Sequence, residues 1–433
     1  MCGKYRKAAR KVSLVTTVEK QLFSDLFLTK KGSRSVSRDG DSIVIVGGEL
    51  FNKGAQAMTF TVVDQMTERY PEKDIYLLSG RDYERNPEDK DQYEFEILPW
   101  GPETQLSLLS PKLEFTNTQR YPKQTRESVR RVISNCFLMI DINGFALSSQ
   151  MGAKTSFVYL TNIVIAREYN IPMYILPQSI GPFDYSTAMG VLLNPLMQTY
   201  LSDPQIICPR ERAGVESLAP YTQGNVQREF DIVLQNESYD FENIYTTEPE
   251  FEQKELEGDA VGIVPNSKVF ERTDSEGLYS LYEAVISKLL KEEKTVYVLR
   301  HSVEDLDLCQ NIKRRFSDND NVVLFEEDLN AIELENIIEQ FDFMIGSRYH
   351  SLVHAYKNQV PAIAIGWAVK YRELLDEFDQ TEYFFEGRER IDKEELLSSL
   401  SEMCDSYSNE AKIIGEKLDD IQQNNVFDNL FCR

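Results

Sequence analysis

An arginine and a histidine two residues apart are the strongest chemical signal in the chain. Arg348 and His350 lie in the segment Gly-Ser-Arg-Tyr-His-Ser (346–351), after an apolar run and before a helical pattern that begins at about Ser351. At a helix N-terminus both side chains can reach one ligand, and the helix dipole favours a negatively charged one. Imidazole exchanges protons near neutral pH, and guanidinium binds carboxylate or phosphate. The pair therefore predicts acid–base chemistry on a bound anion.

Two further segments carry residues suited to the same ligand. Arg210 follows an apolar run in Cys-Pro-Arg-Glu-Arg (208–212), where a guanidinium can bind an anion through two hydrogen bonds. Asn52 and Gly54 belong to a glycine-rich turn (47–56) between a predicted strand and a predicted helix, where free backbone N–H groups can face an anion. A charged surface run and a plain tight turn are the alternative interpretations. The glycine spacing fits neither a dinucleotide-binding motif nor a P-loop.

Polar loops also follow several other predicted strands. Asp141 begins Asp-Ile-Asn-Gly (141–144), Gln178 lies in Pro-Gln-Ser-Ile-Gly-Pro (177–182), and His301 lies in Arg-His-Ser (300–302). Any one of these loops can be ordinary turn chemistry. No group of His, Cys and Asp residues has metal-ligand spacing, and no Gly-x-Ser-x-Gly is present, so we expect neither a metal nor a nucleophilic serine.

The elements that must position these loops alternate between short β-branched runs and helical patterns. Such alternation predicts parallel sheets covered by helices, in two doubly wound (Rossmann-like) α/β domains. The loops above follow strand ends, and the carboxyl ends of parallel strands share one edge, so a binding site is expected in a cleft between the domains. The predicted strands cover residues 42–46, 74–78, 136–142, 173–176, 205–208, 260–264, 295–299, 322–325, 343–345 and 362–365.

The domain division follows from where this alternation fails. We predict a first α/β domain over 42–234, an acidic linker over 235–258, a second α/β domain over 259–390 and a C-terminal helical segment over 391–433. Residues 1–41 are predicted to form a basic, helical N-terminal extension. Packing against the protein body is one interpretation of this extension, and lying on an anionic membrane surface is the other.

Composition excludes several classes of function. The chain carries a net charge of −24, and because residues 1–38 contribute +8, the remainder carries −32. An acidic body offers no basic footprint for nucleic acid, so an anionic ligand must be held by a few focused cations. The six cysteines are scattered without a CxxC pair, as in a cytosolic protein, and we expect neither an export signal nor a membrane span.

In order and spacing, the loops resemble those of the polysaccharide pyruvyl transferase family, from about residue 42 to about residue 385. Asn143 and Gln56 depart from the pattern of that family. The resemblance implies a GT-B-like arrangement of the two domains. The motifs that carry it are Asn-Lys-Gly-Ala-Gln-Ala (52–57), Asp-Ile-Asn-Gly-Phe (141–145), Pro-Gln-Ser-Ile-Gly-Pro-Phe (177–183), Arg-Glu (210–211) and Ser-Arg-Tyr-His-Ser (347–351).

The resemblance also implies the reaction. The donor would be phosphoenolpyruvate, and the product a cyclic pyruvate ketal on two hydroxyls of a sugar in a cell-surface or exopolysaccharide glycan. It assigns the acid role to His350, anion binding to Arg348 and Arg210, and a base or acceptor-orienting role to Asp141. No cofactor is implied, and the expected location is cytoplasmic, with contact at the inner face of the membrane as an option. Further substrate contacts are expected from Asn52, Gly54, Gln178, Ser351 and His301.

Two other functions fit the same architecture. A nucleotide-sugar glycosyltransferase would need a carboxylate for the ribose, and Glu326 and Glu327 are the candidates. A glycan-binding relative without turnover is the second, although the retained Arg348 and His350 argue against it. The acceptor is left open among lipid-linked, nucleotide-linked and polymeric sugars.

Overall fold

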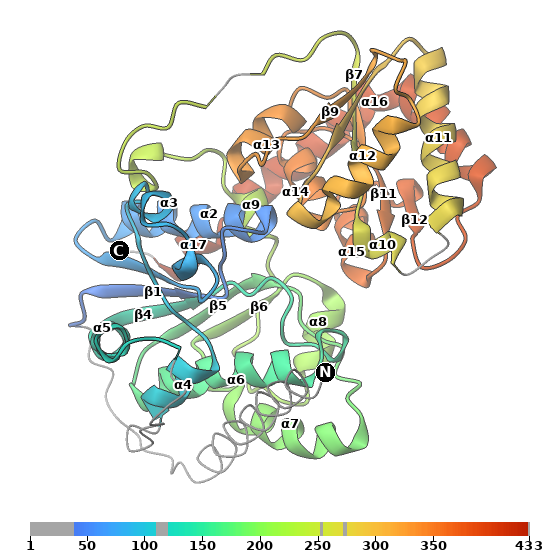
Figure 1. Cartoon of the computed structure of the whole chain (residues 1–433). Helices are drawn as coiled ribbons and strands as arrows, with labels where there is room; N and C mark the ends of the chain where they lie inside the picture. Colours follow the sequence, from blue (N-terminus) through green and yellow to red (C-terminus); the bar gives the residue numbers. More distant parts are fainter. Residues whose placement is uncertain (1–38, 110–119, 252–253, 272–274, 432–433) are drawn as a thin grey trace, which may run out of the picture.

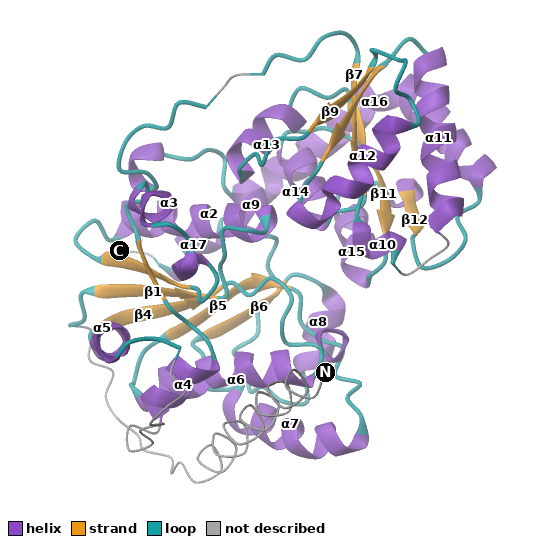
Figure 2. Ribbon diagram, viewed as in Figure 1, coloured by secondary structure: helices purple, strands orange, loops and turns teal. Residues whose placement is uncertain are grey.

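The computed structural model describes residues 39–109, 120–251, 254–271 and 275–431 of the 433-residue chain. The predicted basic extension (1–41) lies almost entirely outside these residues. Within them, the chain forms two parallel six-stranded sheets with helices on their faces (Figures 1 and 2). The prediction of two doubly wound α/β domains is therefore confirmed.

The first sheet has the strand order β3-β2-β1-β4-β5-β6. Its central strands are short apolar runs that are buried on both faces, as parallel strands under helices must be. Its strands are β1 (Ser42–Val46), β2 (Asp74–Leu78), β3 (Glu96–Leu98), β4 (Cys136–Asp141), β5 (Met173–Gln178) and β6 (Ile206–Pro209). The accompanying helices are α2 (Lys53–Arg69), α3 (Pro87–Asp91), α4 (Pro102–Leu109), α5 (Lys123–Ser134), α6 (Ala153–Glu168), α7 (Thr187–Tyr200), α8 (Arg212–Leu218) and α9 (Ile232–Gln235).

The second sheet repeats this topology in the order β12-β11-β10-β7-β8-β9. Its strands are β7 (Ala260–Val264), β8 (Thr295–Leu299), β9 (Val322–Phe325), β10 (Phe343–Gly346), β11 (Ala362–Gly366) and β12 (Phe384–Glu386). Its helices are α10 (Ser267–Phe270), α11 (Ser275–Lys291), α12 (Leu306–Arg314), α13 (Ala331–Ile338), α14 (Tyr349–Lys357), α15 (Val369–Glu377) and α16 (Lys393–Gln422). The last helix, α17 (Val426–Leu430), packs on the first unit.

The strand order reverses between β1 and β4 in the first sheet and between β7 and β10 in the second. Ligands of doubly wound sheets bind at such switch points, beyond the carboxyl ends of the strands. The loops after these four strands hold the glycine-rich turn, the Asp141 loop, Asn266 and the Arg348–His350 pair. The topology thus places most of the predicted site loops at the two switch points.

The edge strands β3 and β12 were not predicted from the sequence. Each has only three residues, which is too short for a period-two pattern to stand out. Short edge strands limit unwanted pairing with other chains, so their brevity fits their position.

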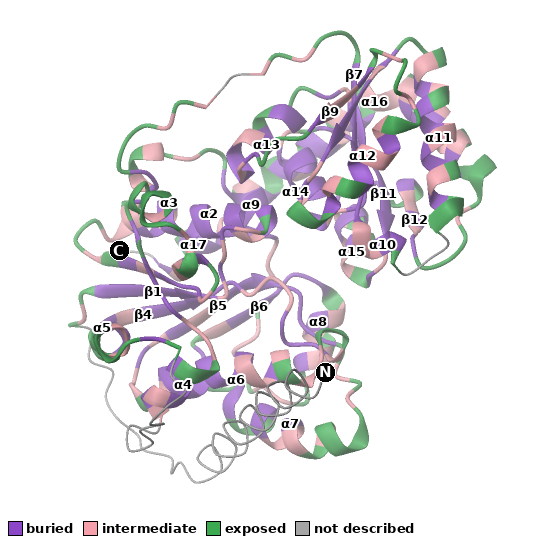
Figure 3. Cartoon of the chain, viewed as in Figure 1, coloured by how far each residue is buried: buried purple, intermediate pink, exposed green. Residues whose placement is uncertain are grey.

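One apolar core continues from the first unit into the second. In each sheet a central strand, β1 or β7, is buried along its whole length (Figure 3). The shared core joins the α2 face of the first sheet to the sheet and helices of the second unit, whereas a separate core fills the other face of the first sheet. The segment predicted as a linker (235–258) contributes to it: Tyr245 is buried, and its ring lies 5.7 Å from that of Phe60 and 5.5 Å from that of Tyr93. The first half of this segment therefore packs on α2.

The end of the described chain returns to the first unit, where α17 lies against α2 and α9 (Figure 1). Gln235 accepts a hydrogen bond from the backbone N–H of Val426 at 2.6 Å, and the ring of Phe431 lies 4.8 Å from that of Tyr174. Phe427 is fully buried. None of the helices that the structure describes has both the length and the apolar composition needed to cross a bilayer.

Candidate active site

The two units meet at the N-terminal ends of α2 and α14. Gly54, in the first turn of α2, packs directly on the imidazole of His350: a Cβ added to Gly54 would lie 2.1 Å from Nδ1. Non-bonded atoms do not approach this closely, so only glycine fits at this position while His350 keeps its place. The predicted Gly54 and His350 are thus in direct contact across the two units.

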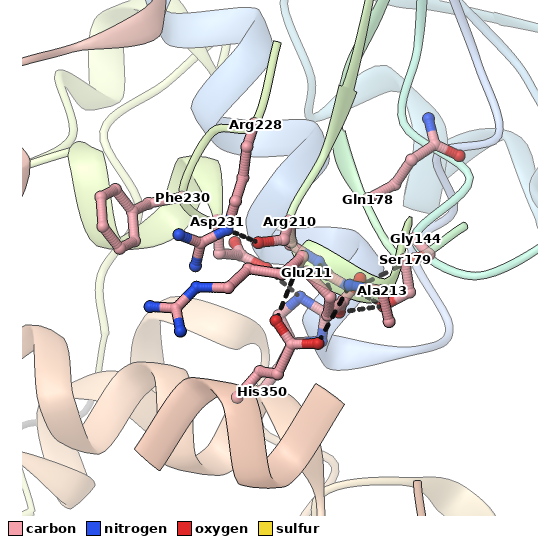
Figure 4. Close-up of polar contacts among 12 residues, drawn as sticks. Gly144, Gln178, Ser179, Arg210, Glu211, Ala213, Arg228, Phe230, Asp231 and His350 are labelled. Atoms are coloured by element: carbon pink, nitrogen blue, oxygen red, sulfur yellow. Dashed lines mark hydrogen bonds and ion pairs between the residues drawn. The ribbon is translucent and has the colours of Figure 1, made fainter. Parts of the chain in front are cut away.

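Arg210 is anchored at the centre of the site (Figure 4). Its guanidinium forms an ion pair with Asp231, just before α9, and donates hydrogen bonds to the Ser179 hydroxyl at 2.9 Å and to the Gly144 carbonyl at 3.1 Å. One face of the guanidinium stacks on the Tyr349 ring, 4.6 Å from its centroid. Arg210 therefore connects loops of the first unit to α14 of the second.

His350 faces the same carboxylate. Its Nε2 lies 3.5 Å from Oδ2 of Asp231, which Arg210 already neutralises. Burial, followed by the nearby Arg210 guanidinium, lowers the pKa of His350 well below its usual value, so the imidazole is neutral at pH 7. A neutral imidazole beside a paired carboxylate is suited to accept a proton before it gives one.

Arg348 also has carboxylate partners. Its guanidinium donates to Asp305 at 2.8 and 2.6 Å and to Glu304 at 2.8 Å, and its backbone carbonyl accepts from the Ser351 hydroxyl at 2.7 Å. Asp305 lies at the start of α12 and also accepts from the N–H of Ser267, after β7. The predicted anion-binding arginine is therefore held by loops that follow three strands of the second sheet.

The predicted Asn52 caps a helix. Its side-chain oxygen accepts from the N–H groups of Gly54 at 3.1 Å and Ala55 at 3.3 Å, so it occupies donors that were expected to face a ligand. Two neighbours tie this helix end to the second unit. Gln56 accepts from the N–H of Ala331 at 3.0 Å, and Lys53 pairs with Asp328 at 3.0 Å.

Asp141 and Gln178 lie beneath the site and have no exposed surface. Asp141 accepts hydrogen bonds from the side-chain amides of Asn143 at 2.9 Å, Gln178 at 3.1 Å and Asn162 at 3.3 Å. Burial raises its pKa, while these amide bonds oppose the rise. In this structure Asp141 holds together the loops after β4 and β5. Its catalytic role stays a prediction.

His301 is buried behind the site, with its ring 6.1 Å from that of His354. Its Nε2 has no hydrogen-bond partner in the described part of the chain. Burial, with His354 next, lowers its pKa well below the usual value. His354 bonds to Glu335 at 3.1 Å and is fully buried. All three histidines of the chain therefore lie on or next to α14.

Two titratable residues of the cleft were missed in the sequence. Glu49, within the glycine-rich turn, is half-buried, and burial followed by Asp82 raises its pKa. Lys370, in the first turn of α15, lines a cavity of about 160 Å³ between the units, together with Phe145 and Glu211. In the sequence, the position of Lys370 after a predicted strand of the second sheet was the signal that could have selected it. A single lysine in such a turn is weak evidence for a functional site.

The described residues include no cluster of three or more His, Cys, Asp or Glu side chains arranged for a metal ion.

Comparison with known proteins identifies the family. A model of the polysaccharide pyruvyl transferase family matches residues 52–368, well over half of the chain. The chain belongs to this family. The matched residues include every predicted site residue, from Asn52 to Ser351. No protein of curated function matches the chain.

Solved structures share the fold of this family member at low identity. UDP-GlcNAc 2-epimerase from Methanocaldococcus jannaschii is 10% identical, with 83% of this chain and 92% of that chain covered and a TM-score of 0.52. A putative UDP-N-acetylglucosamine 2-epimerase from Listeria monocytogenes is also 10% identical, with 88% and 95% covered and a TM-score of 0.52. Anabaena HepE bound to UDP-glucose is 12% identical, with 90% and 96% covered and a TM-score of 0.50. At these identities the likeness concerns the fold alone.

Replacing Gly54 by alanine should damage the site. The new Cβ would displace the His350 imidazole or separate the units, so we expect a loss of about 1–3 kcal/mol in the free energy of unfolding and a drop in turnover. Chemical denaturation measures the first. Gly190→Ala on α7 is the control, because the nearest atom to its Cβ would be 3.7 Å away and helix propensity should leave stability unchanged or higher. Equal behaviour of the two variants would contradict the packing described.

Stability should fall as the pH falls below about 6.5. In the unfolded chain His301 and His350 take up protons near their usual pKa, whereas the folded state holds both pKa values lower. Below pH 6.5 the unfolded state therefore binds more protons than the folded state. The free energy of unfolding is highest above pH 6.5 and falls below it. Each histidine should remove about 1 kcal/mol of unfolding free energy between pH 7.5 and 5.5. The difference in pH slope between the unaltered chain and His301→Gln isolates one contribution. An identical slope would show that folding leaves the pKa of His301 unchanged.

Proposed function

We propose that this protein transfers the pyruvyl group of phosphoenolpyruvate to two hydroxyls of a glycan sugar, forming a cyclic ketal and releasing phosphate. The observation that carries the proposal is the contact of Arg210, Asp231 and His350 across the two units, in a chain whose family is established. This contact joins an anion-binding cation, a carboxylate and a neutral imidazole. The reaction needs a proton carrier beside a bound anion, and the contact supplies both.

The donor carries a carboxylate and a phosphate, and two arginines are available for them. Arg348 lies at the N-cap of α14, where the first backbone N–H groups of the helix add to the positive potential. Nε of Arg210 is buried without a hydrogen-bond partner in the described structure, and the nearby Glu211 carboxylate lies 3.9 Å from it. Carboxylates already hold both guanidinium groups in place, so the guanidinium groups need little reorganisation when the donor binds.

The proton balance gives His350 two consecutive tasks. Its neutral imidazole takes the proton of the first acceptor hydroxyl and, as imidazolium, gives it to the methylene carbon of phosphoenolpyruvate, which becomes the methyl group of the ketal. This protonation leaves a cationic centre at the second carbon, and the first acceptor oxygen bonds to it. Phosphate leaves, the second hydroxyl attacks the same carbon, and its proton passes to phosphate. Asp231, 3.5 Å from Nε2, stabilises the transient imidazolium.

The acceptor is proposed to be a sugar of a cell-surface or exopolysaccharide glycan, modified in the cytoplasm. The family supports a polysaccharide-related acceptor. A nucleotide-sugar glycosyltransferase receives less support from the side chains: Glu327 is paired with Lys254, and both Glu326 and Glu327 are exposed. Glu326 and Glu327 are therefore placed like residues of an ordinary surface loop and not like the carboxylate of a ribose site.

Ligand-dependent unfolding tests the donor. Phosphoenolpyruvate at about 100 times its dissociation constant should add about 2.7 kcal/mol of stability and raise the melting temperature, because the ligand binds only the folded state. UDP and UDP-sugars serve as parallel ligands. A shift with these nucleotides and none with phosphoenolpyruvate would overturn the proposal in favour of a glycosyltransferase.

Replacing His350 by glutamine tests the mechanism. Turnover, measured as phosphate release in the presence of an acceptor glycan, should fall about 10²-fold or more, because glutamine cannot carry a proton. The phosphoenolpyruvate-induced melting shift should persist, since both arginines remain. His354→Gln is the matched control: it disturbs the buried bond to Glu335 and should lower stability while turnover in the folded protein stays normal. Full turnover in His350→Gln would remove the histidine from the mechanism.

A further inference from the structure

The second unit supplies the cap of a helix that belongs to the first unit. Glu373 of α15 accepts hydrogen bonds from the backbone N–H groups of Arg212 at 2.6 Å and Ala213 at 3.2 Å, the first two residues of α8. The first N–H groups of a helix have no partner inside it, and the residue just before the helix commonly caps them. Here the cap comes from the other unit, 160 positions further along the chain than Ala213.

The residue in the N-cap position of α8 points toward the site instead. This residue is Glu211, and its side chain makes no capping bond within the described structure. Its carboxylate accepts a hydrogen bond from the Ser179 hydroxyl at 2.6 Å and lies 3.9 Å from Nε of Arg210. Because Glu373 caps the helix, Glu211 is available to contact the side chains around Arg210.

A second carboxylate of α15 holds the same backbone segment from its other end. Arg228 donates a hydrogen bond from Nε to the carbonyl oxygen of Arg210 at 3.0 Å (Figure 4). The guanidinium of Arg228 in turn pairs with Glu377 of α15, and Glu377 also pairs with Arg212 at 3.0 Å. The backbone that carries Arg210 is thus connected to α15 on both sides.

We infer that Glu373 and Glu377 are positioning residues that hold Arg210, the proposed donor arginine, in place from the second unit. In this role they act on the backbone beside Arg210, Glu373 directly and Glu377 through Arg228, and they need no contact with the donor. We call the contacts of these two carboxylates with α8 and Arg228 the α15 clasp. The inference rests on the proposed function, because that function gives Arg210 its ligand.

The clasp matters because the proposed donor site is divided between the units. Arg210 follows β6 of the first unit, whereas Arg348 and His350 lie at the start of α14 in the second. Asp231, Ser179 and a loop carbonyl orient the Arg210 guanidinium within the first unit. The clasp ties the Arg210 backbone to the second unit, so it contributes to the spacing between the two arginines that hold one donor.

The clasp also lies beside the cavity between the units. Ala213 and Gly214 of α8 line this cavity from one side, and Val369 of α15 lines it from the other. Glu373 lies one helical turn after Val369 and bonds to the N–H of Ala213, so the clasp joins the two walls. Without it α8 and α15 could separate, and water entering the wider cavity would weaken the electrostatic contacts of the site.

Titration calorimetry with phosphoenolpyruvate tests the inference on the full chain. Glu373→Ala should raise the dissociation constant about tenfold, because Arg210 loses its fixed place relative to Arg348. Glu373→Gln should stay within about twofold of the unaltered chain, because the amide oxygen can still accept from both N–H groups. Asp392→Ala is the matched control: Asp392 caps α16 through the N–H groups of the next helical residues at 2.9 and 3.2 Å, away from the site. It should lower the melting temperature about as much as Glu373→Ala and leave the dissociation constant unchanged.

A second variant covers the case in which Glu373→Ala does not fold. Glu377→Gln weakens the ion pairs with Arg228 and Arg212 but leaves the helix cap in place, and it should raise the same dissociation constant about threefold. If the folded variants bind phosphoenolpyruvate as tightly as the unaltered chain, the inference is overturned while the proposed function stands. If the unaltered chain does not bind phosphoenolpyruvate, both the proposed function and the inference are wrong.

Discussion

The contact between the imidazole of His350 and the backbone of Gly54 sets the geometry of the site. Because Gly54 has no side chain, the N-terminal ends of α2 and α14 approach each other, and each belongs to a different sheet. This approach brings the switch point of one sheet against that of the other. The stacking of Arg210 on the Tyr349 ring, the approach of His350 to Asp231 and the interunit bond of Gln56 all depend on the same spacing.

Charge organisation follows from this packing. The structure surrounds each arginine of the site with carboxylates and loop carbonyls, so that guanidinium groups are fixed before any ligand arrives. Fixed dipoles and charges favour catalysis because little rearrangement is needed during the reaction. The burial that neutralises His350 belongs to the same arrangement.

Much of this could be read from the sequence, and the failures have physical causes. The central strands were predicted nearly to the residue because each is a short apolar run followed by a turn, and Gly54 and His350 were selected as loop residues. Their direct contact could not be predicted, because it is set by how the two units pack. The burial of Asp141 was missed because its amide partners come from β5 and α6. Lys370 was missed because its place in the cavity between the units is set by how the two units pack.

The return of α17 to the first unit has a consequence for synthesis of the protein. The fully buried Phe427 fills space in the first unit, yet the ribosome adds it only after the whole second unit has been synthesised. Since domains generally begin to fold as they leave the ribosome, the first unit must wait with part of its apolar surface uncovered. The two units therefore complete their folding together. The first unit expressed by itself would present its uncovered apolar surface to chaperones or to other chains, and the second unit would present Phe427 of α17.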